Sequence, residues 1–121
     1  MRYVLLLKGE PREGGQPDVT LVAALAAYIE ELVGAGILLA AEGLHPSSMG
    51  ARIRFAGGGH TVVDGPVAEA ADTLAGYLLI EVRSREEAIA WASRCPADQA
   101  VLAGPSAGIE VRRVFDLAAA G

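Results

Sequence analysis

Short apolar runs alternate with helix-like segments along the chain, and these runs predict the strands of a sheet. Residues 3–7 form an unbroken apolar run that ends before a glycine and a proline, which is typical of a central strand buried on both faces. Residues 37–41 and 77–82 have the same character, and residues 109–112 predict a last strand. Residues 10–17, rich in glycine, proline and charge, predict a loop.

Two other segments carry apolar residues at the spacing of one helical face. The first starts after Asp18, a candidate N-cap, and its apolar positions are Leu21, Val22, Leu25, Tyr28, Ile29, Leu32 and Val33. Gly34 and Gly36 can adopt the left-handed conformation that ends a helix. The second helix is predicted to begin with the capping pair Ser84 and Glu87 and to end at a proline. Its predicted buried positions are Ala88, Trp91, Ala92 and Cys95.

An alternating pattern predicts a β-hairpin in the middle of the chain. Residues 51–55 alternate small or apolar side chains with arginines, and three glycines then turn the chain into residues 60–63. The predicted order is therefore strand, helix, strand, hairpin, strand, helix, strand. This order predicts an α+β ferredoxin-like sandwich, a mainly antiparallel sheet with two helices on one face. Because the other face needs cover, we predict a homodimer.

Composition and charge indicate one folded domain. The 121 residues are 52% hydrophobic, so we assign a single domain to 1–121, with a folded core over 1–116 and a fraying tail over 117–121. The net charge of −5 opposes binding to nucleic acid. We expect no membrane segment and no secretory signal, because no apolar stretch is long enough. The single cysteine excludes an intrachain disulfide and favours a cytoplasmic location.

The most unusual local sequence is the turn Asp64-Gly65-Pro66-Val67 with Glu69 just beyond it. Gly65 permits a positive φ, Pro66 presets the next turn, and Asp64 can accept hydrogen bonds from nearby amides, so one interpretation is structural. The other interpretation is that the turn directs Asp64 and Glu69 into a cleft as a proton-transfer or substrate-orienting pair. The two interpretations are compatible.

Three further polar residues are candidates for the same cleft. His45 follows the second predicted strand, where an imidazole can exchange protons, although a solvated loop histidine is the simpler interpretation. Tyr77, at the start of a buried strand, is expected to line the cleft. Arg112 lies on a strand, like the hairpin arginines, and would bind an anionic group or pair with a carboxylate such as Glu81 or Glu110.

Other features with chemical potential are better explained by structure. Glycines 57–59 lie between two strands, whereas a phosphate-binding loop leads into a helix. Cys95 lies on an apolar helical face with no base to activate its thiol. His45, Asp64 and Glu69 lack the close spacing of a typical metal site, so we expect no metal and no cofactor.

Taken together, these motifs resemble the YCII-related domain family, and more closely its DGPF branch. The matching segments cover nearly the whole chain: residues 3–7, 42–46, 64–69, 76–82, 88–96 and 109–114. The resemblance implies a ferredoxin-like fold that dimerises. YCII-like relatives include a dehydrochlorinase of a chlorinated hydroquinone, with a His–Asp pair in a cleft.

This chain departs from the family pattern at two points. The histidine of that pair lies near the first helix of the relatives, whereas this chain has only His45 and His60. Val67 replaces the phenylalanine that gives the DGPF branch its name, which removes an aromatic wall from the cleft. Genes of the branch often lie beside those of extracytoplasmic-function sigma factors, which implies a regulatory or accessory role.

Two functional hypotheses follow from the residues and the resemblance. The first is a dimeric small-molecule enzyme or binder with a cleft near the ends of the second and fourth strands. Asp64 and His45 would be its catalytic groups, and Glu69, Tyr77 and Arg112 would bind the substrate. The second is a non-catalytic dimeric accessory protein that associates with an extracytoplasmic-function sigma factor.

Overall fold

A computed structural model describes residues 1–11, 19–65, 73–96 and 102–117 of the chain. The helices are α1 (Val19–Gly34), η1 (Ser47–Met49, a short 3-10 turn) and α2 (Arg85–Ser93). The strands are β1 (Arg2–Pro11), β2 (Leu38–Gly43), β3 (Ala51–Ala56), β4 (Gly59–Asp64), β5 (Leu74–Glu81) and β6 (Leu102–Arg113). Within the described residues, no helix has the length and apolarity that a membrane span requires.

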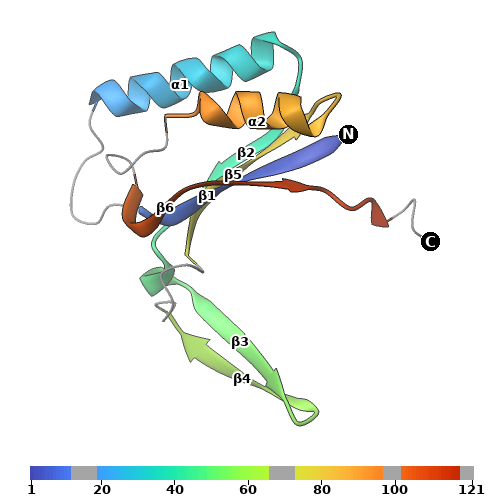
Figure 1. Cartoon of the computed structure of the whole chain (residues 1–121). Helices are drawn as coiled ribbons and strands as arrows, with labels where there is room; N and C mark the ends of the chain where they lie inside the picture. The colour runs from blue at the N-terminus through green and yellow to red at the C-terminus, as the bar shows by residue number, and fades with distance from the viewer. Residues whose placement is uncertain (12–18, 66–72, 97–101, 118–121) are drawn as a thin grey trace.

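Four of the strands form one antiparallel sheet in the order β2-β5-β1-β6. Both α1 and α2 lie on the same face of this sheet (Figure 1). The element order and this placement confirm the predicted ferredoxin-like α+β fold. The apolar runs of β1 and β5 occupy the two central positions, where a strand is flanked on both edges.

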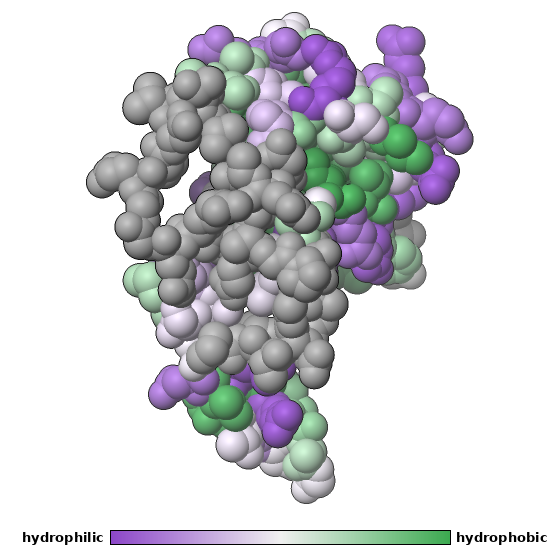
Figure 2. All heavy atoms as spheres, turned by 60° about the vertical axis from the view of Figure 1, so that its left-hand side comes forward, coloured by the Kyte–Doolittle hydropathy of each residue, from purple (hydrophilic) through white to green (hydrophobic). Residues whose placement is uncertain are grey.

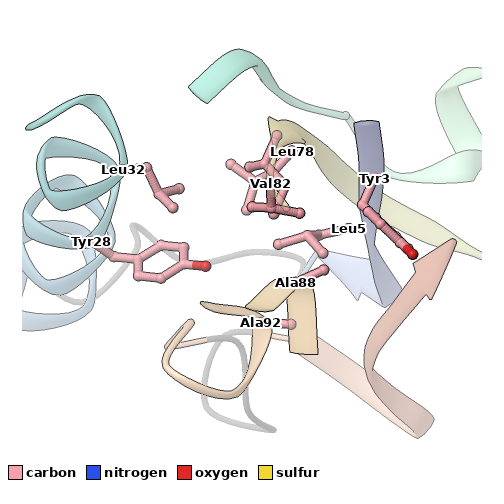
Figure 3. Close-up of a cluster of buried hydrophobic side chains, with 9 residues drawn as sticks. Tyr3, Leu5, Tyr28, Leu32, Leu78, Val82, Ala88 and Ala92 are labelled. Atoms are coloured by element: carbon pink, nitrogen blue, oxygen red, sulfur yellow. The ribbon is translucent and has the colours of Figure 1, made fainter. Parts of the chain in front are cut away.

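The hydrophobic core fills the layer between the sheet and the helices (Figure 3). Successive residues of a strand point to opposite faces, so Leu78 and Ile80 face the helices while Tyr77 faces away. Ile80, Leu5 and Leu32 are the largest fully buried side chains. Each aliphatic side chain buried in this way stabilises the fold by roughly 1.5–3 kcal/mol.

The opposite face of the sheet has no covering element among the described residues. We call it the open face, and its side chains are all at least partly exposed: Arg2, Val4, Leu6, Lys8, Ala40, Glu42, Tyr77, Leu79, Glu81, Glu110 and Arg112. Aliphatic side chains of the two central strands lie in its middle, and charged side chains surround them.

Helix α1 buries the middle of its predicted apolar stripe, and Val33 at the end of the stripe lies in solvent. Tyr28 and Leu32 are buried, whereas Val33 is 61% exposed, so the prediction that Val33 shares their helical face is wrong. Val33 follows Leu32 directly, and one residue turns the helix by about 100°, which carries this side chain off the buried face. The helix ends where Gly36 takes a φ of 72°. The candidate cap Asp18 lies outside the described residues.

Helix α2 begins with the cap that the sequence indicates. The Ser84 hydroxyl accepts a hydrogen bond from the Glu87 N–H at 3.1 Å. The Glu87 carboxylate accepts from the N–H of Arg83 at 3.0 Å, one residue before the N–H used in a capping box. Ala88 and Ala92 are buried, and their small side chains let the helix approach the sheet closely.

Contacts at the end of α2 connect it to α1. The Tyr28 hydroxyl donates a hydrogen bond to the carbonyl oxygen of Trp91 at 2.8 Å. Arg94 forms an ion pair with Glu31, and its guanidinium carbon lies 4.9 Å from the ring centroid of Trp91. The half-buried Trp91 packs against the core, as predicted.

Strands β1 and β6 are longer than the local sequence pattern indicated. They continue to pair beyond a register shift, with Glu10 opposite Ala103 and Pro11 opposite Leu102. The expected strand at 109–112 is therefore the end of a longer one, and the loop predicted over 10–17 is wrong at Glu10 and Pro11, which lie in β1. Pairing between segments about 90 residues apart creates this extension, and local periodicity cannot report such pairing.

The predicted β-hairpin forms, but as a separate two-stranded sheet of β3 and β4. Its turn contains Gly57 and Gly58 with φ of 58° and 78°, the two positive values that a type I′ turn requires. We call this hairpin the arm. It projects on the side of the main sheet opposite the helices (Figure 1), and hydrophobic surface lies open on it beside charged side chains (Figure 2).

Candidate functional site at the base of the arm

The segment between β2 and β3, residues 44–50, joins the arm to the main sheet by backbone hydrogen bonds. At its start, the N–H of Leu44 donates a hydrogen bond of 2.8 Å to the carbonyl oxygen of Ala75, the second residue of β5. At its end, the carbonyl oxygen of Gly50 accepts from the N–H of Gly65 at 2.8 Å, just beyond β4. The segment is therefore bonded both to the sheet and to the end of the arm.

Gly65 is required here by a close approach of two backbones. A Cβ atom at this position would overlap the carbonyl oxygen of Ser47 and lie 2.8 Å from its carbonyl carbon and 3.2 Å from the Gly50 oxygen. The positive φ that the sequence suggested for Gly65 is not adopted. Absence of a side chain is what lets Gly65 pack against the segment. We call residues 44–50 and 64–65 the arm base.

Both residues predicted to be catalytic belong to the arm base. Asp64 ends β4 opposite Ala51 of β3, and its side chain is exposed. His45 is the second residue of the segment after β2 and is also exposed. Within the described part of the chain, no hydrogen bond or ion pair joins His45 to Asp64. Both groups are accessible to a molecule that approaches from solvent, and neither is held by the other.

Tyr77 lies on the open face close to the arm base. It is paired with Glu42 of β2 and Leu6 of β1, and β2 continues from Glu42 into the arm base two residues later. The neighbouring Gly76 allows the strands to meet tightly, because a Cβ there would lie 2.6 Å from the Glu42 carbonyl oxygen. A glycine inside an otherwise apolar strand is a sign of such a close approach, and the strand predicted over 77–82 did not include Gly76.

Comparison with known proteins identifies the family of this fold. The family model of the YCII-related domain matches residues 1–118. The chain belongs to the YCII-related family. A similar solved structure is 5-chloro-2-hydroxyhydroquinone dehydrochlorinase (TftG) from Burkholderia phenoliruptrix AC1100, in complex with 2,5-dihydroxybenzoquinone. It is 20% identical, with a TM-score of 0.52, and the match covers 95% of this chain and 94% of that chain. At this identity the likeness concerns the fold. No curated protein matches the chain.

In this YCII-related chain, Arg112 lies away from the arm base. It stands on the open face opposite Val4, and its Nη1 lies 3.5 Å from Oε1 of Glu110, which confirms the predicted ion pair. Oε2 of Glu110 lies 3.8 Å from Nζ of Lys8. Tyr77 is two strands across and two residues along from Arg112, which separates the two Cα atoms by about 12 Å.

Among the described residues, the predicted ion pairs of Glu81 and of the two hairpin arginines do not form. Glu81 binds the amino group of Met1 at 3.2 Å instead of an arginine. Arg52 and Arg54 share one face of the arm, since they occupy alternate positions of β3. No carboxylate of the described residues forms an ion pair with either of them.

The second carboxylate of the predicted pair, Glu69, lies outside the described residues, as do Pro66 and Val67. In the described ranges, no three His, Cys, Asp or Glu side chains gather at a distance that would hold a metal ion. Burial raises the pKa of the Cys95 thiol to about 11, which agrees with a packing role for this residue. The described arm base thus presents one carboxylate and one imidazole, and Tyr77 lies on β5 opposite Glu42, two residues before the arm base begins.

Proposed function

We propose that this YCII-related chain binds a small organic molecule at the arm base and transfers a proton to or from it. Asp64 and His45 are the proton-transferring groups, and Tyr77 and Glu69 bind the molecule. The observation that carries this proposal is the contact of Gly65 with Ser47, which holds Asp64 beside the segment that contains His45. Arg112 is assigned to its ion pair with Glu110 and not to the site.

The chemistry follows from the two exposed side chains. A carboxylate attached to a backbone that is bonded on both sides moves little, so it can accept a proton from a hydroxyl group of a bound molecule. An imidazole on the neighbouring segment can return a proton to the molecule or pass one to solvent. Because the fold neighbour TftG holds a dihydroxybenzoquinone, hydroxylated quinones are the first class of molecule to test.

We further propose that the working form is a homodimer in the cytoplasm. Val4, Leu6 and Leu79 form a partly exposed aliphatic patch in the middle of the open face, and a second open face can cover it. The DGPF branch of the family remains our assignment for the Asp64-Gly65-Pro66 turn. The free thiol of Cys95 is compatible with a reducing compartment.

Calorimetric titration with 2,5-dihydroxybenzoquinone and a small set of hydroxylated aromatic acids tests the site. We expect at least one of them to bind, and we expect Asp64→Asn and His45→Gln each to weaken binding about 10-fold or more, as expected when a charged hydrogen bond is lost. The matched control is Glu30→Gln, an exposed carboxylate on α1, which should bind like the parent chain.

Melting temperature separates the catalytic interpretation of Asp64 from the structural one. If Asp64→Asn lowers the melting temperature strongly and leaves binding intact, Asp64 serves the turn and the proposal is wrong. If none of the molecules binds, the non-catalytic accessory role becomes the better hypothesis. A pull-down with the purified chain as bait would then test the sigma-factor association.

A further inference from the structure

The two faces of the arm differ sharply in chemistry. On one face, Ile53 pairs with Val62 and Phe55 pairs with His60, whose ring centroid lies 6.3 Å from that of Phe55. Asp64, opposite Ala51, ends this face at the arm base, and the apolar side chains lie beyond it toward the tip. On the other face are Arg52, Arg54, Thr61 and Val63. The arm is therefore amphipathic, although the described chain packs nothing against it.

The apolar face of the arm is open to solvent. Ile53, Phe55 and Val62 are 53%, 81% and 59% exposed. Since a large aromatic side chain alone presents about 200 Å², these three leave roughly 300 Å² of apolar surface uncovered. An isolated two-stranded hairpin is at best marginally stable in water, and it needs a further layer against its apolar face. Something must cover this face if the arm is to keep its shape.

We infer that the apolar face of the arm docks onto a second copy of this chain. This inference deepens the homodimer proposed above and rests on it. The open face spans four strands and about seven paired residues, or roughly 450 Å². A stable interface buries about 800 Å² on each partner. Each surface alone falls far below that value, whereas the arm and the open face together, at roughly 750 Å², come close to it.

The placement of the two surfaces also favours one symmetric partner. The arm projects on the same side of the main sheet as the open face, opposite the helices (Figure 1). A second copy related by a two-fold axis can pack its open face on this one and receive the arm at the same time. Each arm then lies on the other copy with Arg52 and Arg54 directed to solvent, which accounts for the charged residues on that face.

Two substitutions one residue apart test the orientation of the arm. Val62→Asp places a charge on the apolar face, and Thr61→Asp places the same charge on the polar face of the same strand. Sedimentation equilibrium should find the parent chain and Thr61→Asp as dimers with dissociation constants within about 3-fold of each other. Val62→Asp should raise the dissociation constant about 100-fold or more, because each dimer contains the change twice.

Three outcomes would overturn the inference, and they separate its parts. A parent chain that is monomeric at about 100 μM refutes both the homodimer and the docked arm. A dimer in which Val62→Asp has no effect, or in which both variants dissociate equally, refutes the docked arm alone. Far-ultraviolet circular dichroism of each variant checks the fold, which should persist because both side chains are exposed in the single chain. Binding at the arm base is measured separately by calorimetry.

Discussion

Replacing Gly65 by alanine probes the contact on which the arm base depends. The added methyl group would meet the backbone of Ser47 and Gly50, and backbone atoms cannot move aside as a flexible side chain can. Overpacking of this kind costs about 1–3 kcal/mol. Loss of the 2.8 Å hydrogen bond from Gly65 to Gly50 adds about 1 kcal/mol. The smaller entropy of the unfolded alanine chain offsets about 0.4–1 kcal/mol.

The net expectation for Gly65→Ala is a loss of about 2 kcal/mol in the free energy of unfolding, or a melting temperature lower by about 8 °C. Urea unfolding followed by Trp91 fluorescence at one fixed protein concentration measures it. Gly34→Ala is the matched control: no atom outside its own stretch of helix lies within 4 Å of its added Cβ, and its φ is not positive. We expect that variant to be unchanged or slightly more stable. If Gly65→Ala stays within about 0.5 kcal/mol of the parent chain, our account of the turn is wrong.

The remaining predictions concern the contact between the helices. Tyr28→Phe removes the hydroxyl that donates to Trp91 and should lower the free energy of unfolding by about 1 kcal/mol in the same urea assay; an unchanged midpoint would contradict this. Burial raises the pKa of Cys95 from 9.0 to about 11, so a disulfide reagent at pH 8 should modify the folded chain about 100-fold more slowly than a free thiol. The same burial stabilises the protonated thiol, so the free energy of unfolding should be constant below pH 9 and fall as pH rises to about 11. Burial also raises the pKa of Tyr28, which adds to the loss above pH 10, and a urea midpoint that does not change between pH 8 and 11 would refute both effects.

The element order and the family were accessible from the sequence alone. Apolar runs and helical spacing are local signals, so they located both helices and the central strands, and the cap at Ser84 follows from a pair three residues apart. The ferredoxin-like class then followed, because few arrangements of these elements cover a sheet on one side. The sequence also singled out Gly65, although it could not tell that a close approach of two backbones is the reason for this glycine.

Tertiary structure alone decided which distant segments meet. Pairing of Pro11 with Leu102 lengthened two strands, and contact of Gly65 with Ser47 brought Asp64 to the segment of His45. Arg112 was kept from that site by the strand β1 between them. Such outcomes depend on register and on backbone distances between residues far apart in the chain. A local pattern of polar and apolar residues carries no information about those distances, whereas it does determine which residues prefer a helix, a strand or a turn.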